Sequence, residues 1–130
     1  MEKADLTERT KRFSIRIVNL TVYLADTYTA KMISHQILRS GTSVGANYRA
    51  ACRSKSRRDF INKLKVVEEE TDETLFWLEL IEACNLLKVD KVEWLKKESN
   101  ELLSIFVSSL KTARKNGLKS KGQQKDEKYE

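Results

Sequence analysis

Proline is absent from this chain of 130 residues, and glycine occurs only four times. Because proline usually punctuates sheets and loops, its absence predicts long helices joined by short connections. Hydrophobic residues make up 40% of the chain, which is enough for a packed interior and argues against wholesale disorder. The length corresponds to one domain, which can bury a core without disulfides or metals.

Long apolar runs are also missing, because charged residues interrupt the hydrophobic stretches. This pattern excludes a transmembrane helix. The start of the chain, Met1-Glu2-Lys3-Ala4-Asp5, lacks the apolar core of a signal peptide, so we expect a cytoplasmic protein with no membrane partner. In that reducing compartment, Cys52 and Cys84 are expected to be small core residues rather than a disulfide.

The residues that usually carry catalysis or metal binding are scarce as well. His35 is the only histidine, so the sequence has no Glu-x-x-His pair of the di-iron helical bundles. It also has no Cys-x-x-Cys pair, no glycine-rich phosphate loop and no nucleophile elbow. We therefore expect no metal, no cofactor and no enzymatic activity. An active site would need residues brought together between subunits.

Four amphipathic segments account for most of the sequence. Their apolar residues recur at helical spacings, and we place the helices at about 6–26, 30–54, 57–87 and 90–116. Four helices with very short connections predict an all-α fold, an antiparallel up-down four-helix bundle over residues 1–117. The polar remainder, 118–130, has no periodicity and is expected to be a disordered tail.

Local signals mark the predicted helix ends. Three pairs have the form of a capping box, in which a side chain at the helix start bonds the backbone three residues on. These pairs are Asp5 with Glu8, Ser56 with Asp59, and Asp90 with Glu93. Residues 26–29 supply a turn and a further N-cap, and Asn116-Gly117 is expected to close the last helix.

Gly41 and Gly45 lie in the middle of the second predicted helix, where each costs about 1 kcal/mol relative to alanine. They are four residues apart and share one helix face. One interpretation is a turn between two short helices; the other is a bare face that another backbone approaches closely. Two overlapping stripes that meet at Tyr48 favour a helix covered from two sides, within the bundle or at a subunit interface. Thr71 and Thr74 are expected to pack opposite the glycines.

The net charge of +6 is unevenly distributed. If the helices alternate up and down, residues 1–12, 49–65 and 108–121 meet at one end of the bundle, which we call the basic end. Their net charges are +1, +6 and +5, so the basic end carries +12. The rest of the chain then sums to −6, and the acidic run 68–73 contributes most of it.

The cations of the basic end have two interpretations. Charge runs are usually solvated helix faces, and cations at 111–115 suit a helix C-terminus on dipole grounds. Arg57 and Arg58 do not fit that account, because positive charge is unfavourable in the first turn of a helix. The alternative is binding of a polyanion such as nucleic acid, without base-specific readout. The candidate nucleic-acid-binding residues are Arg49, Arg53, Lys55, Arg57, Arg58, Lys111, Arg114 and Lys115.

The acidic run also has a predicted partner. A hairpin of the second and third helices about residue 56 would place residues 69–73 beside residues 38–42. Arg39 would then pair with a glutamate of that run, in its own chain or in a neighbouring one, and this structural role is preferred to ligand binding. Trp94 is assigned to the core or an interface rather than to base stacking. The predicted structural or interface residues are Arg39, Gly41, Gly45, Tyr48, Glu69, Glu73 and Trp77.

Several blocks of the sequence resemble one known family. The blocks are QILRSGTSVGANYRAA (36–51), FINKL (60–64), EETDE (69–73), FWLELI (76–81) and NELLSIF (100–106). In order and spacing they resemble the four-helix bundle proteins of the 23S rRNA intervening-sequence family, also called S23 ribosomal proteins. The resemblance covers about residues 10–116. It implies a bacterial cytoplasmic protein that assembles as a ring, typically a homopentamer, with no known enzymatic activity and a connection to RNA or DNA.

Two functions are consistent with the sequence. The first is a non-enzymatic homo-oligomeric bundle that binds RNA or DNA through its basic end, without sequence specificity. The alternative is a protein-interaction scaffold or structural adaptor that has no nucleic-acid ligand. The expected partners are therefore other copies of the chain and, in the first case, a nucleic acid.

Overall fold

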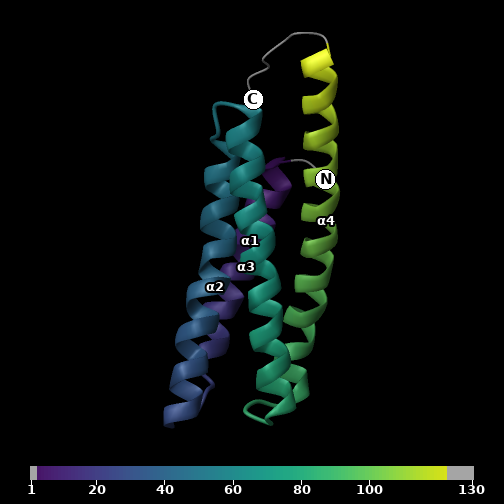
Figure 1. Ribbon diagram of the computed structural model, residues 1–130. Coiled ribbons are helices and arrows are strands. Elements are labelled where there is room, and N and C mark those ends of the chain that lie inside the picture. The colour runs from purple at the N-terminus through teal and green to yellow at the C-terminus, as the bar shows by residue number, and fades with distance from the viewer. Residues whose placement is uncertain (1–2, 123–130) are drawn as a thin grey trace.

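The structure is a computed structural model that describes residues 3–122, with side chains described for residues 5–117. It consists of four helices: α1 (Lys3–Thr21), α2 (Tyr28–Cys52), α3 (Arg57–Ala83) and α4 (Val89–Gly122). Within the described residues every regular element is a helix, so the fold is a four-helix bundle (Figure 1). None of these helices is both long enough and apolar enough to cross a membrane.

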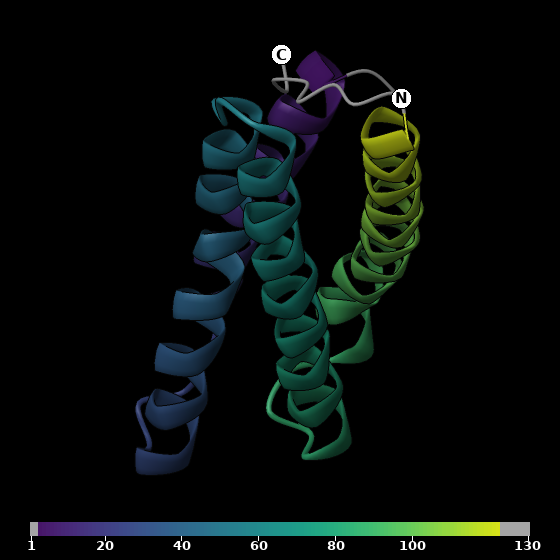
Figure 2. The same cartoon turned by 45° about the horizontal axis from the view of Figure 1, so that its top comes forward.

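The path of the chain brings the start of α1, the α2–α3 connection and the end of α4 toward the same end of the molecule (Figure 1). Figure 1 shows α2 rising from the lower end, α3 returning beside it and α4 rising again. Both Figure 1 and Figure 2 show α2 and α3 side by side next to their connection, with their far ends diverging. Side-chain contacts give the register: Ser14 of α1 meets Gly45 of α2, and Glu82 of α3 meets Lys96 of α4.

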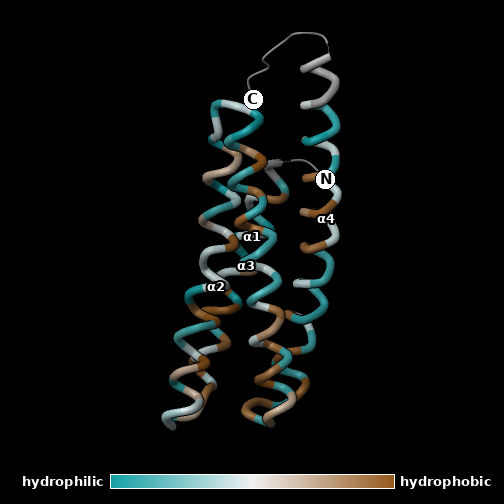
Figure 3. The backbone as a smooth tube through the Cα atoms, viewed as in Figure 1, coloured by the Kyte–Doolittle hydropathy of each residue, from teal (hydrophilic) through white to brown (hydrophobic). Residues whose placement is uncertain are grey.

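The core lies between the four helices and is built from one face of each. Hydrophobic and hydrophilic residues alternate along α2, α3 and α4 (Figure 3), as expected for amphipathic helices that bury one side. The ring of Tyr48 stacks on that of Phe106, with 6.0 Å between centroids, and ties α2 to α4. The largest fully buried hydrophobic side chains are Phe13, Phe106, Ile17, Ile37, Leu64, Leu78, Ile81, Leu102, Val44, Val67 and Val92.

The N-caps of the two central helices confirm two sequence predictions. The backbone N–H of Ala30 donates to the Thr27 hydroxyl at 3.2 Å, and that of Asp59 donates to the Ser56 hydroxyl at 3.1 Å. The predictions for the outer helices are wrong, because Asp5 and Asp90 lie inside the first turns of α1 and α4. A carboxylate in the first turn is stabilised by the helix dipole. Aspartate is therefore common both at the N-cap and in the first turn, and its presence alone does not distinguish the two positions.

The predicted ends of α1 and α3 also differ from the structure. α1 ends at Thr21 instead of about residue 26, and α3 ends at Ala83 instead of about residue 87. The apolar pattern misled here because Leu24 and Leu86, although outside the helices, still pack against the core. Asn85 ends the α3 region with a left-handed backbone, φ 56°, which asparagine tolerates better than most residues.

The last helix is longer than the sequence predicted. Asn116-Gly117 does not close it, since α4 continues to Gly122 and takes in the first part of the predicted tail. Gly117 does not adopt a positive φ, so it lacks the left-handed geometry of a helix-ending glycine. The rest of the predicted tail, 123–130, lies outside the described residues.

Candidate nucleic-acid interface

The start of α3 and the end of α4 touch each other at the basic end. A Cβ atom placed on Gly117 would lie 3.1 Å from Cδ of Arg57, so the glycine leaves room for the arginine side chain against the α4 backbone. Arg57 is accordingly half-buried, whereas Arg58 is exposed. Two of the three stretches that make up the basic end therefore form one continuous surface.

The candidate cations other than Arg57 are exposed and uncompensated. Among the described residues, none of them forms an ion pair or a hydrogen bond with a side-chain acid. Cations nearby on α3 behave differently: Lys63 pairs with Asp59 at 3.0 Å, and Lys65 pairs with Glu68 at 3.3 Å. The uncompensated cations are Arg49, Arg53, Lys55, Arg58, Lys111, Arg114 and Lys115.

This distribution concentrates positive potential at the basic end. Exposed charges that lack acidic partners act together on a polyanion, and their field is screened by salt over about 10 Å at 0.1 M. Residues 1–12 contribute less positive potential than their number of cations suggests, because Arg9 forms ion pairs with Glu98 at 2.7 Å and with Glu101 at 2.9 Å. The hydrogen bonds that the Arg9 guanidinium donates to the Glu98 carboxylate are the main cause that raises the pKa of Arg9. Arg9 thus ties α1 to α4 instead of adding to the free charge.

The glycines of α2 lie against α1. A Cβ atom on Gly41 would lie 2.6 Å from Cγ2 of Ile17, and one on Gly45 would lie 2.8 Å from the Ser14 hydroxyl. α2 runs unbroken through both positions, so the turn interpretation is wrong. The prediction that Thr71 and Thr74 of α3 pack opposite the glycines is also wrong, because the bare face of the glycines is covered by α1. Thr74 instead donates a hydrogen bond to the hydroxyl of Ser40 at 2.9 Å.

Arg39 joins an ion-pair network between α2 and α3 of its own chain. Its guanidinium donates to the carboxylates of Glu70, at 3.4 Å, and of Glu73. The Glu73 carboxylate also accepts a hydrogen bond from the indole N–H of Trp77 at 3.0 Å. Glu69 was also predicted to be a structural or interface residue, but it is exposed and takes no part in the network among the described residues.

The two aromatic residues that the sequence assigned to the core or an interface have different environments. Tyr48 is 3% exposed and belongs to the core. Trp94 is 41% exposed, and the guanidinium carbon of Arg16 lies 4.0 Å from the centroid of its ring. Arg16 carries no signal of this role in the sequence, because pairing it with Trp94 requires the register of α1 against α4.

Neither metal nor disulfide chemistry is evident in the described part of the chain. No group of three or more histidine, cysteine, aspartate or glutamate side chains there could hold a metal ion. Cys52 and Cys84 are both free thiols, in agreement with the sequence prediction. Cys52 is half-buried near the Thr7 hydroxyl, but Cys84 is exposed and therefore not the core residue that was predicted.

A four-helix bundle that carries uncompensated cations at one end is the class of protein defined by this geometry. The family model of the 23S rRNA-intervening sequence protein matches residues 2–108, and the chain belongs to that family. This confirms the resemblance found in the sequence blocks. The motif QILRSGTSVGANYRAA corresponds to the part of α2 that packs against α1.

A solved structure shares both the fold and much of the sequence. It is the crystal structure of a protein with unknown function from the S23 ribosomal protein family of Bacteroides thetaiotaomicron VPI-5482. The two chains are 39% identical with a TM-score of 0.76, and the alignment covers 82% of this chain and 98% of the other. No curated protein matches the chain.

Proposed function

We propose that this chain is a non-enzymatic cytoplasmic protein that binds RNA or DNA through its basic end. In this proposal the antiparallel up-down bundle assembles as a ring-shaped homo-oligomer, a homopentamer, so that the basic end is presented several times. The observation that carries the proposal is the set of exposed cations on α2, on the α2–α3 connection, on α3 and on α4 that have no acidic partner among the residues whose side chains are described, 5–117. Their side chains are available for phosphate groups without first breaking an ion pair.

The expected binding is electrostatic and independent of sequence. Each phosphate that a lysine or arginine neutralises releases condensed counterions, so affinity falls steeply as salt rises. Repetition of the same cations around a ring would multiply the contacts and raise avidity without any new contact. Phosphate contacts of this kind position a nucleic acid but do not read its bases.

The test is a salt titration of binding to labelled RNA and duplex DNA by fluorescence anisotropy. Arg53→Gln/Lys55→Gln/Arg58→Gln removes three exposed cations of the basic end that form no ion pair among the described residues, and it spares the packed Arg57. For duplex DNA, loss of three phosphate contacts should reduce the slope of log K against log salt by about 2.7 for each chain of the ring that contacts the duplex. A matched control, Lys31→Gln/Lys88→Gln/Lys97→Gln, removes the same charge from exposed positions elsewhere.

The control variant should bind like the parent chain. Absence of binding by the parent at low salt would overturn the proposal. Equal binding by the basic-end variant and the parent would place the interface elsewhere and overturn the assignment to these residues.

A second candidate function, an interaction scaffold without a nucleic-acid ligand, is favoured by an apolar strip on α1 and on the turn that follows it, which we call the α1 strip. Ile15, Val18 and Val22 recur at helical spacing and are 49%, 42% and 78% exposed. Exposed apolar side chains on one face are typical of a protein interface. A chain that assembles normally but binds neither RNA nor DNA would support this function over the first.

A further inference from the structure

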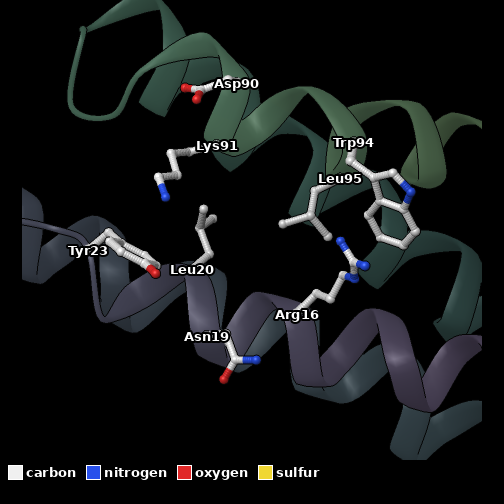
Figure 4. A pocket seen from close by; sticks show the side chains of 8 residues that line it. All are labelled: Arg16, Asn19, Leu20, Tyr23, Asp90, Lys91, Trp94 and Leu95. Atoms are coloured by element: carbon white, nitrogen blue, oxygen red, sulfur yellow. The ribbon is translucent and has the colours of Figure 1, made fainter.

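The end of α1 and the start of α4 enclose a groove with a volume of about 370 Å³ (Figure 4). We call it the α1–α4 groove. It lies away from the basic end, since about 20 residues of α4, or about 30 Å, separate it from the cations around Arg114. Its lining residues are Arg16, Asn19, Leu20, Tyr23, Asp90, Lys91, Trp94 and Leu95.

Two cation–aromatic pairs stand at the two ends of the groove. One joins α1 to α4, and the other joins the turn after α1 to α4. The guanidinium carbon of Arg16 lies 4.0 Å from the ring centroid of Trp94, and Nζ of Lys91 lies 4.1 Å from that of Tyr23. Figure 4 shows both cations reaching across the space between the helices, with Leu20 and Leu95 between them. The groove therefore combines an apolar floor, two aromatic rings and two positive charges.

Neither ring is fully covered by its cation. Trp94 remains 41% exposed and Tyr23 remains 59% exposed. Within the described part of the chain, neither Arg16 nor Lys91 forms an ion pair with a carboxylate, so both keep their charge for an incoming anion. Aromatic faces and guanidinium planes stack nucleobases, and lysine and arginine bind phosphate.

From this arrangement we propose that the α1–α4 groove binds a nucleotide unit, a nucleobase with its attached phosphate. The volume lies near the lower end of the range for ligand pockets, which suits a group of that size and not a large cofactor. In this site the base stacks on Trp94 or Tyr23, and the phosphate is held between Arg16 and Lys91.

The charge of the groove favours a strand over a free nucleotide as the source of that unit. Arg16 and Lys91 are opposed by the carboxylate of Asp90, which leaves a net charge of +1. This balances the single charge of a phosphodiester better than the dianion of a free monophosphate. A duplex offers no unstacked base, so single-stranded nucleic acid is the expected ligand. This inference shares with the proposed function only the class of ligand, because it depends on different residues.

Trp94 itself provides the readout. The chain contains two tryptophans, and Trp77→Phe leaves Trp94 as the only one. Stacking of a base on the indole should quench its fluorescence. The probes are a single-stranded oligouridylate, uridine monophosphate and a blunt DNA duplex, titrated into the assembled full chain at low salt.

The oligouridylate should give saturable quenching of Trp94, with an affinity at least tenfold higher than that of uridine monophosphate, and the duplex should give none. Trp94→Phe, which retains Trp77 in its network with Glu73, should show no quenching with any probe. If Trp77→Phe disturbs the fold, the indole N–H signals of the parent chain, assigned with Trp94→Phe, report the same event by NMR.

Charge variants separate a binding site from a purely structural tie between helices. Arg16→Gln and Lys91→Gln should each weaken the quenching by the oligouridylate at least fivefold. Lys97→Gln, an exposed lysine of α4 outside the groove, should leave it unchanged. An equal loss in all three variants would mean general electrostatic attraction and would overturn the proposal.

The remaining outcomes are also decisive. No Trp94 quenching by any probe, together with duplex binding that the basic-end variant abolishes, would overturn the groove site and support the proposed function. Saturable quenching by the oligouridylate in a chain that binds no duplex would support the groove site and overturn duplex binding by the basic end. Stronger quenching by uridine monophosphate than by the strand would support the nucleotide site and assign it to the free nucleotide.

Discussion

The backbone N–H of Gly45 in α2 donates a hydrogen bond to the hydroxyl of Ser14 in α1, at 3.1 Å. The same hydroxyl donates to the carbonyl of Gly41 at 2.8 Å. These two backbone groups belong to residues i and i+4 of one helix, so a single serine is hydrogen-bonded to both ends of one turn of α2. Such a contact requires the two helix backbones to lie close together, which the absence of a side chain at both glycines permits.

Gly45→Leu should therefore destabilise the fold. Even a Cβ atom at this position would lie 2.8 Å from the Ser14 hydroxyl and 3.1 Å from the carbonyl oxygen of Thr10, and the remaining leucine atoms need further space. We expect a loss of about 1–3 kcal/mol in the free energy of unfolding, measured in urea. Ala46→Leu, at the neighbouring exposed position, should change it by less than about 0.5 kcal/mol. Equal stability of Gly45→Leu and the parent would contradict the close-packing account.

Removal of Arg9 should cost more than removal of another arginine of α1. Glu98 is only 9% exposed, and Arg9→Gln leaves its carboxylate without the charged partner. We expect a loss of about 2–3 kcal/mol in the free energy of unfolding. Arg12→Gln, which removes an exposed arginine without an ion pair among the described residues, is the control and should have little effect. The double variant Arg9→Gln/Glu98→Gln should recover part of the loss, and strictly additive effects would show that the two residues are not coupled.

The ion pair between Lys96 and Glu82 should weaken at alkaline pH. The hydrogen bond to Glu82 raises the pKa of Lys96 above its ordinary value of 10.5. Because the folded-state pKa is the higher one, the stabilisation is fully present below the unfolded pKa and is lost as pH rises through the folded pKa. The stability difference between the parent and Lys96→Gln should thus be constant from pH 7 to 9 and shrink above pH 11. Urea unfolding at each pH measures it, and an unchanged difference at high pH would indicate packing instead of charge.

The proposed assembly predicts a solution mass near five times the 15.1 kDa of one chain, measured by light scattering. If the α1 strip forms the interface between copies, Val18→Lys/Val22→Lys should lower the mass toward that of a monomer at micromolar concentration, with helical content unchanged. The comparison variant Val66→Lys/Val107→Lys places the same charges at exposed valines of α3 and α4. Dissociation of the comparison variant alone would show that the interface between copies involves α3 or α4 and not the α1 strip. A monomeric parent would contradict the ring.

The sequence predicted the helices better than their contacts. Periodicity located all four helices, and Ser56 marked the start of α3 correctly, because both signals act within a few residues. The end of α4 was missed because Gly117 serves a contact with Arg57, which is distant in the sequence, and does not serve as a cap. Local patterns contain no information about such a partner.

The candidate sites show the same division. The cations of the basic end could be predicted from composition and topology, because placing charge at one end of a bundle does not require the exact register of the helices. The pairing of Arg16 with Trp94, and of Ser14 with the glycines, depends on how one helix slides along another. That register is fixed by core packing over the whole helix, which the residues of either segment alone do not determine.

The exposure of Cys84 has a practical consequence. This thiol follows α3 at the end away from the basic end, about 40 Å from Arg57 along the helix. Cys52, the other thiol, is half-buried. A maleimide dye should therefore attach selectively at Cys84 and leave the cations unobstructed. Energy transfer between dyes on different copies of the chain would then report assembly. Tags at the chain ends are less suitable, since α1 begins and α4 ends on the charged side of the molecule.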